Sequence, residues 1–123
     1  MKSAFLPTGG ILAGDCVAHI MRRGFDQPIS TLARWIVNRD VVAFEERGEL
    51  WVPMFQFNPD LQVRPGVRKV IEELRGVFDE WELVDWFARP NSSLCGENPA
   101  SVVLCNERAV LEAAMVDRFI ATG

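Results

Sequence analysis

The sequence predicts a mainly α, α+β fold: a compact helical domain with one antiparallel β-hairpin and a helix-loop-helix C-terminal half. Apolar residues recur at helical spacing in several separate segments, which is typical of amphipathic helices. Two β-rich runs, residues 41–44 and 50–57, are joined by a short segment with Gly48, which indicates a hairpin. The chain has 123 residues, of which 49% are hydrophobic, so residues 1–123 are expected to form a single domain with one core.

Residues 1–63 are predicted to form a helix-turn-helix followed by the hairpin. Asp15 is expected to cap a first helix that Gly24 stops. A second helix over residues 29–38 carries Leu32, Trp35 and Ile36 at helical spacing. The hairpin follows, and Pro53 within it has no N–H to donate, so its N–H side is expected to face an edge.

Residues 64–123 are predicted to be helical. A helix with apolar residues at i, i+3, i+4 and i+7 starts near Val67 and ends before Gly76. Asp79 with Glu82 forms a capping-box pattern at the start of the next helix. Asn106 is expected to cap the terminal helix. That helix bears Val110, Ala113, Ala114, Val116 and Phe119.

A tight loop is predicted between these last helices. Pro90 forces Arg89 away from helical dihedral angles, so the preceding helix ends there. Asn91 and Gly96 are expected to take the positive φ angles that a compact loop requires, and Pro99 opens the next helix. The loop is therefore expected to be a shaped surface element.

The residues around this loop follow the pattern W-(F/L)-x-x-P-N-x-x-L-x-G-x-x-P-x-x-x-(V/L). They are Trp86, Phe87, Pro90, Asn91, Leu94, Gly96, Pro99 and Val103. The pattern resembles the toxin-binding domain of the Xre/MbcA/ParS-like antitoxins, small bacterial proteins that neutralise RES-domain toxins. The resemblance covers residues 64–123 and is weaker upstream. The same residues also suit an ordinary helix-loop-helix corner, with Trp86 and Leu94 in the core.

The resemblance implies an antitoxin-like interaction module whose partner is a RES-domain toxin, a class that acts on NAD. The loop and the C-terminal tail would be its docking elements. Carried over by position, the partner-binding residues are Trp86, Pro90, Asn91, Leu94, Gly96, Pro99, Arg118, Phe119, Thr122 and Gly123.

Charge is distributed unevenly along the chain, whose net charge is −4. Residues 1–40 carry five basic and three acidic residues, whereas residues 41–123 carry eight basic and fourteen acidic ones. Because phosphate neutralisation dominates nucleic-acid binding, any DNA contact belongs to the N-terminal third. The alternative function is a winged helix-turn-helix regulator that contacts DNA weakly. The arginines that would make this contact are Arg22, Arg23, Arg34 and Arg39.

Two observations limit this alternative. Residues 1–40 show no long Xre-type helix-turn-helix segment, and the second helix carries no run of base-reading side chains. The same segments also suit plain core elements with solvated arginines. Autorepression is therefore less expected than toxin binding.

Catalysis finds little support. The chain has one histidine and no tyrosine, and it shows no G-x-S-x-G, P-loop or Rossmann glycine pattern, so we expect no enzyme and no cofactor. Cys16 and His19 share a helix face, but Cys95 and Cys105 lack the paired spacing of a structural zinc site. We expect no metal and three reduced, buried thiols.

The lengths of the apolar runs and the number of aromatic residues bear on localisation and assembly. No apolar run approaches the roughly 20 residues that span a bilayer, and residues 1–7 are too short for a secretory signal, so a cytoplasmic protein without membrane contact is expected. Four tryptophans and eight phenylalanines are many rings for a chain of this size to bury, so we expect a homo-oligomer, most simply a dimer.

Overall fold

The structure is a computed structural model, and it describes residues 2–123. It has the mainly helical α+β architecture that the sequence predicts. The elements in chain order are η1 (Lys2–Thr8), β1 (Ile11–Ala13), α1 (Gly14–Met21), α2 (Pro28–Val37), β2 (Phe44–Glu46), β3 (Glu49–Pro53), η2 (Met54–Gln56), α3 (Pro65–Leu74), α4 (Glu80–Ala88), η3 (Ser92–Leu94), α5 (Pro99–Val102) and α6 (Glu107–Thr122).

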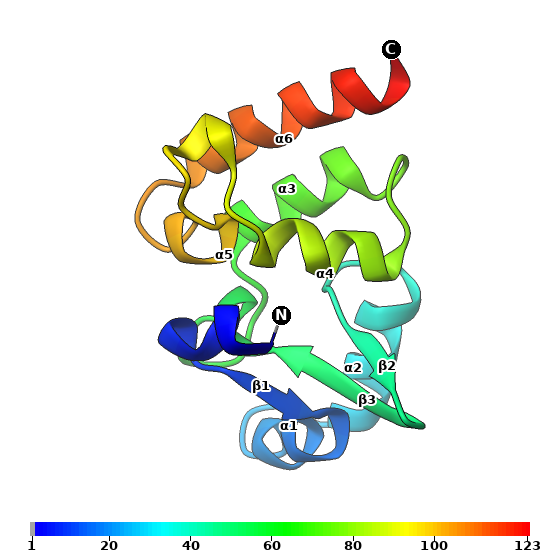
Figure 1. The fold of residues 1–123 in the computed structure, drawn as a ribbon. Coiled ribbons are helices and arrows are strands. Elements are labelled where there is room, and N and C mark those ends of the chain that lie inside the picture. The colour runs from blue at the N-terminus through cyan, green and yellow to red at the C-terminus, as the bar shows by residue number, and fades with distance from the viewer. Residues whose placement is uncertain (1) are drawn as a thin grey trace.

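The sheet lies between two helical layers (Figure 1). Helices α1 and α2 cover one face, and the C-terminal helices with η1 lie on the other. Each face of the sheet has its own hydrophobic core, and successive side chains leading into β2 point to one core and then the other. Val41 and Ala43 belong to the core under α1 and α2, whereas Val42 and Phe44 belong to the core of the C-terminal helices. This alternation reflects the two-residue period of extended chain.

The predicted antiparallel hairpin is present as β2 and β3, and a third strand that was not predicted, β1, extends the sheet to the order β1-β3-β2. Strand β1 pairs antiparallel with β3, with Leu12 opposite Val52. The turn at Arg47 and Gly48 does join β2 to β3 as expected, and both residues have positive φ. The sequence pattern missed β1 because three residues beside Gly9 and Gly10 show no readable period.

The predicted strand bounds also differ from the observed ones. The first strand was placed at residues 41–44, whereas β2 spans Phe44–Glu46, and the second was too long, since residues 54–56 form a 3-10 turn. Gln56 explains both limits. Its fully buried amide accepts from Val42 N–H and donates to Val42 O, each at 2.8 Å, and so takes the place of a neighbouring strand. It also donates to Pro53 O at 2.8 Å. Strand β2 does not extend opposite Pro53, where that residue would lack a donor.

The helix boundaries test the capping predictions. Asp79 and Glu82 form the expected capping box, with bonds of 2.8 and 2.9 Å, and Asn106 caps α6 through Ala109 N–H. Asp15 does not cap α1, because that helix already begins at Gly14 and its N-cap is Ala13. Helix α1 ends at Met21, three residues before Gly24, and α3 ends at Leu74, two residues before Gly76, so both helices end earlier than the glycines that were expected to stop them.

The larger core joins the two parts of the chain. Phe5, Phe44 and Phe55 from the first half pack in one cluster with α3, α4 and α6, and Phe55 lies 4.8 Å from Phe87 between ring centroids. Helix α6 packs along α3 (Figure 1). Within residues 2–123, no helix has both the length and the apolar character needed to cross a membrane.

Candidate protein-interaction site

The loop from Arg89 to Asn98 is built as the proline and glycine positions suggest. Arg89 has extended backbone, with φ −82° and ψ 148°, so α4 ends before Pro90. Cys95 and Gly96 have φ of 57° and 81°, and these consecutive left-handed residues turn the chain back toward α5. Pro99 then occupies the first turn of α5, which Asn98 caps through Ser101 N–H at 2.9 Å.

Asn91 organises the loop, although it does so differently from the prediction. Its φ is −119°, so the expected positive φ is wrong. Its side-chain oxygen instead accepts from Ser93 N–H at 2.9 Å, and its carbonyl accepts from the N–H groups of Leu94 and Gly96, each at 3.0 Å. Its own N–H donates to Glu97 O at 3.0 Å. A short asparagine side chain can satisfy the backbone locally in this way.

Asp117 of α6 fastens this loop to the terminal helix. Its Oδ2 accepts from Trp86 Nε1–H at 2.7 Å and from Asn91 Nδ2–H at 3.3 Å. One carboxylate therefore joins α4, the loop and α6. Because the Trp86 side chain is almost fully buried, this bond also satisfies an indole N–H that has little access to water.

Helix α6 carries a second, outward apolar stripe beyond the one that packs on α3. Val110, Ala113 and Ala114 are buried, and the outward residues follow at i, i+1, i+4 and i+5. We call these outward residues the α6 face; they are Met115, Val116, Phe119 and Ile120, with exposed fractions of 50%, 48%, 77% and 69%. Contiguous exposed apolar side chains of this kind are typical of an interaction surface.

Val116 and Phe119, which the sequence places on the terminal helix together with the buried Val110, Ala113 and Ala114, are both exposed. Charged residues border the α6 face. Arg118 forms an ion pair with Glu73 of α3 at 2.9 Å, which holds the exposed end of α6 against the body of the protein.

The predicted partner-binding residues divide into two groups. Trp86, Leu94 and Pro99 are buried, so their side chains shape and support the loop rather than presenting themselves to a partner. The more accessible ones are Pro90, Asn91, Gly96, Arg118, Phe119, Thr122 and Gly123. Arg118 to Thr122 continue α6 as helix, so the tail is a helical surface and not an extended arm.

The residues that sequence reasoning missed are Asp117, Met115 and Ile120. The apolar spacing of the α6 face was visible in the sequence, but it could not be separated from the core stripe that runs beside it. No local sequence pattern identifies Asp117 as a site residue, because its hydrogen-bond partners lie 26 and 31 residues away in the chain.

The three cysteines and the candidate metal ligands can be compared with the expectations from sequence. Cys16, Cys95 and Cys105 are all free and exposed, so the prediction of buried thiols is wrong. Small residues in a loop tip or on a helix surface need not pack in the core. In the part of the chain from residue 2 onward, no group of three or more His, Cys, Asp or Glu side chains converges in a way that would hold a metal ion.

The arginines singled out for DNA do not form one free cluster. Arg39 Nη1 donates to Phe78 O at 2.7 Å and is half-buried between the two halves of the fold. Arg22, Arg23 and Arg34 are exposed on α2 and the end of α1.

Comparison of the chain with protein-family models, curated proteins and solved structures finds no match.

Proposed function

We propose that this chain is an antitoxin-like protein-interaction module that binds and neutralises a RES-domain toxin. The observation that carries the proposal is the arrangement around Asp117. A rigid loop is held beside a helix whose exposed apolar face has no partner within residues 2–123. Such a surface is suited to bury against another protein. The assignment of the partner to the RES class depends on the resemblance of the loop motif.

The chemistry of the site favours binding over catalysis. The exposed side chains of the α6 face are apolar, and the carboxylate of Asp117 already accepts hydrogen bonds from two groups of the fold, Trp86 and Asn91. A binding role needs the loop's shape and apolar anchors rather than a titrating group. Phe119 is the most exposed of the four residues and is the strongest anchor candidate, because aromatic anchors dominate many interfaces.

The test is co-expression with a RES-domain toxin encoded next to this chain, scored by growth and by pull-down. Phe119→Glu should abolish or strongly reduce both, since loss of a central anchor commonly reduces affinity by about 2 kcal/mol or more. Leu6→Glu is the matched control: Leu6 is 71% exposed but lies on η1, so neutralisation should persist. Failure of the unaltered chain to bind the toxin would refute the proposal.

A winged helix-turn-helix regulator is the second candidate, and the strand topology favours it. Strand β1, helices α1 and α2, and the β2–β3 hairpin follow one another in that order, with β1 pairing to β3. This is the order of elements in a winged helix-turn-helix, with α2 as the helix that would enter the major groove.

The surface chemistry is less suited to DNA. The outer side of α2 exposes Ile29 and Val37, at 74% and 79%, where a reading helix needs polar side chains. The wing carries Glu45, Glu46 and Glu49 against Arg47 alone. Any DNA binding should therefore be weak, should fall steeply with added salt in a fluorescence-anisotropy titration, and should show little preference for the protein's own promoter. Tight, salt-resistant binding to one operator would make the regulator the better proposal.

A further inference from the structure

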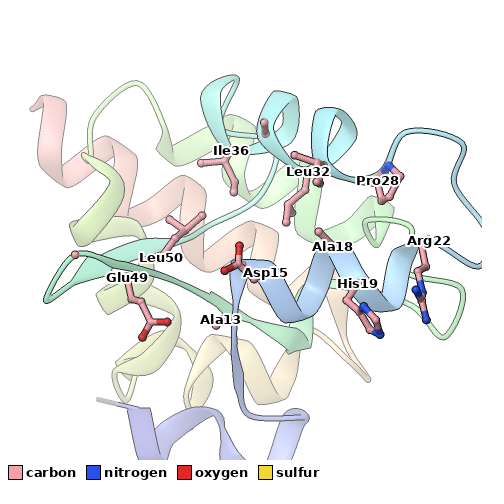
Figure 2. Close-up of a pocket in the computed structure, with 14 residues that line it drawn as sticks. Ala13, Asp15, Ala18, His19, Arg22, Pro28, Leu32, Ile36, Glu49 and Leu50 are labelled. Atoms are coloured by element: carbon pink, nitrogen blue, oxygen red, sulfur yellow. The ribbon is translucent and has the colours of Figure 1, made fainter.

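A groove of about 680 Å³ lies between α1, α2 and the β2–β3 hairpin (Figure 2). Its lining is mostly apolar and includes Ala18, Leu32, Ala33, Ile36 and Leu50. It lies in the α1–α2 layer, so the sheet separates it from the core that α6 completes. The groove is therefore a surface distinct from the α6 face.

Exposed apolar residues of α2 lie at and near the groove. Ile29 and Val37 of α2 are two helical turns apart and are among the most exposed apolar residues of the chain. Ile29 also lines the groove. A twofold interface uses the same patch on both copies, so that patch must contain both an inserted and a receiving part. The exposed apolar side of α2 and the groove can serve as these two parts.

The charges at the two ends of the groove have opposite sign. Figure 2 shows Glu49 and Asp15 toward the hairpin, and Arg22 at the opposite end near Pro28. Among the described residues, neither Arg22 nor Glu49 takes part in an ion pair of its own. Both are exposed, and they are free to meet charges on a partner.

A twofold axis that lies in the interface and crosses the middle of the groove at right angles reverses the direction of the groove in the second copy. The basic end of each copy then faces the acidic end of the other, so complementarity holds twice without any further partner. A small ligand or an unrelated helix would need matching charges of its own, whereas a second copy has them by symmetry.

We propose that this chain forms a twofold homodimer through the α1–α2 groove, with α2 of each copy seated against the groove of the other and Arg22 facing Glu49 of the second copy. The groove has fourteen lining residues, which is about half of the roughly 20–30 residues a side that a standard interface uses. The dimer covers α2, so it leaves no helix for DNA, and it leaves the α6 face open. It does not depend on toxin binding.

A charge-exchange experiment tests this pairing. The unaltered chain should sediment as a dimer over a dilution series in analytical ultracentrifugation. Arg22→Glu alone and Glu49→Arg alone should each raise the dimer dissociation constant about tenfold or more, because each places like charges together at both ends of the interface. An equimolar mixture of the two variants should dimerise again, since every facing pair is then of opposite sign.

Two controls keep the outcome decisive. Both substitutions are at exposed positions, so each variant should unfold at the temperature of the unaltered protein, which shows that dissociation is not misfolding. Phe119→Glu should leave the dimer intact. A monomeric unaltered chain, with or without a small molecule in the groove, would overturn the proposal. So would a mixture that fails to associate, or loss of the dimer in Phe119→Glu, which would place the interface on α6.

Discussion

Removal of the Asp117 carboxylate should loosen the loop and lower the stability of the protein by a measurable amount. Asp117→Ala takes the acceptor from Trp86 Nε1–H, a bond of 2.7 Å, and from Asn91 Nδ2–H, a longer bond of 3.3 Å. Hydrogen bonds to charged groups contribute about 1.5–3 kcal/mol, and the longer bond less. Because Trp86 is only 9% exposed, its N–H gains little from water in return.

We therefore expect Asp117→Ala to lower the free energy of unfolding by about 2–3 kcal/mol. The protein should remain folded, since a domain of this size has about 5–15 kcal/mol in total. In urea, with a slope of about 2 kcal/mol per molar, the unfolding midpoint should fall by about 1–1.5 M. Asp117→Asn keeps one acceptor but loses the charge, so its free energy of unfolding should lie between those of the unaltered protein and Asp117→Ala.

A double-mutant cycle isolates the main bond. Trp86→Phe removes the indole N–H, so the coupling between Trp86→Phe and Asp117→Ala should be about 1.5–3 kcal/mol. Toxin binding should weaken in Asp117→Ala even under conditions where the protein is fully folded, because the loop is no longer fastened to α6. Ordinary surface substitutions change the free energy of unfolding by about 0.5 kcal/mol or less. If Asp117→Ala falls within that range, the bonds to Asp117 do not hold the site together.

Two further substitutions and one deletion probe the fold and the site. Gln56→Met leaves the N–H and O of Val42 and the O of Pro53 without partners, and should destabilise the protein by about 3 kcal/mol or more in the same urea assay; a shift below about 1 kcal/mol would contradict the strand-replacing role of this amide. Gly96→Val places a β-branched residue at φ 81° and should reduce both stability and toxin binding, whereas Ser92→Val in the same loop serves as the control at an ordinary backbone position. Deletion of residues 119–123 should abolish neutralisation but change the free energy of unfolding by about 1 kcal/mol or less, because these side chains are exposed; full neutralisation by the truncated chain would remove the tail from the site.

The local chemistry of the chain could be predicted from sequence to a useful extent. The Asp79–Glu82 capping box, the Asn106 cap, the extended backbone at Arg89 and the helix start at Pro99 all depend on residues within three or four positions of one another. Such features follow from stereochemistry that operates over one turn of chain. The mainly helical class was predictable for the same reason.

Features that join distant parts of the chain were not predictable. The apolar spacing of α6 predicts an amphipathic helix, but it does not say that α3 buries Val110 and Ala114 while Phe119 stays exposed. Strand β1 exists because β3 pairs with it across about forty residues. Neither relation has a local pattern, because each depends on which surfaces the folded chain brings together.

Asn91 and Gln56 show most clearly the difference between what the local sequence determines and what tertiary packing determines. By itself the sequence determined that Asn91 sits in a shaped loop between two helices, since Pro90, Gly96 and Pro99 restrict the backbone there. Only the tertiary structure decided that its side chain would face Asp117 and that Gln56 would replace a strand beside Val42. The physical reason is that a side-chain amide or carboxylate reaches only a few ångströms, so its partner is set by the packing of whole helices and strands and not by its neighbours in sequence.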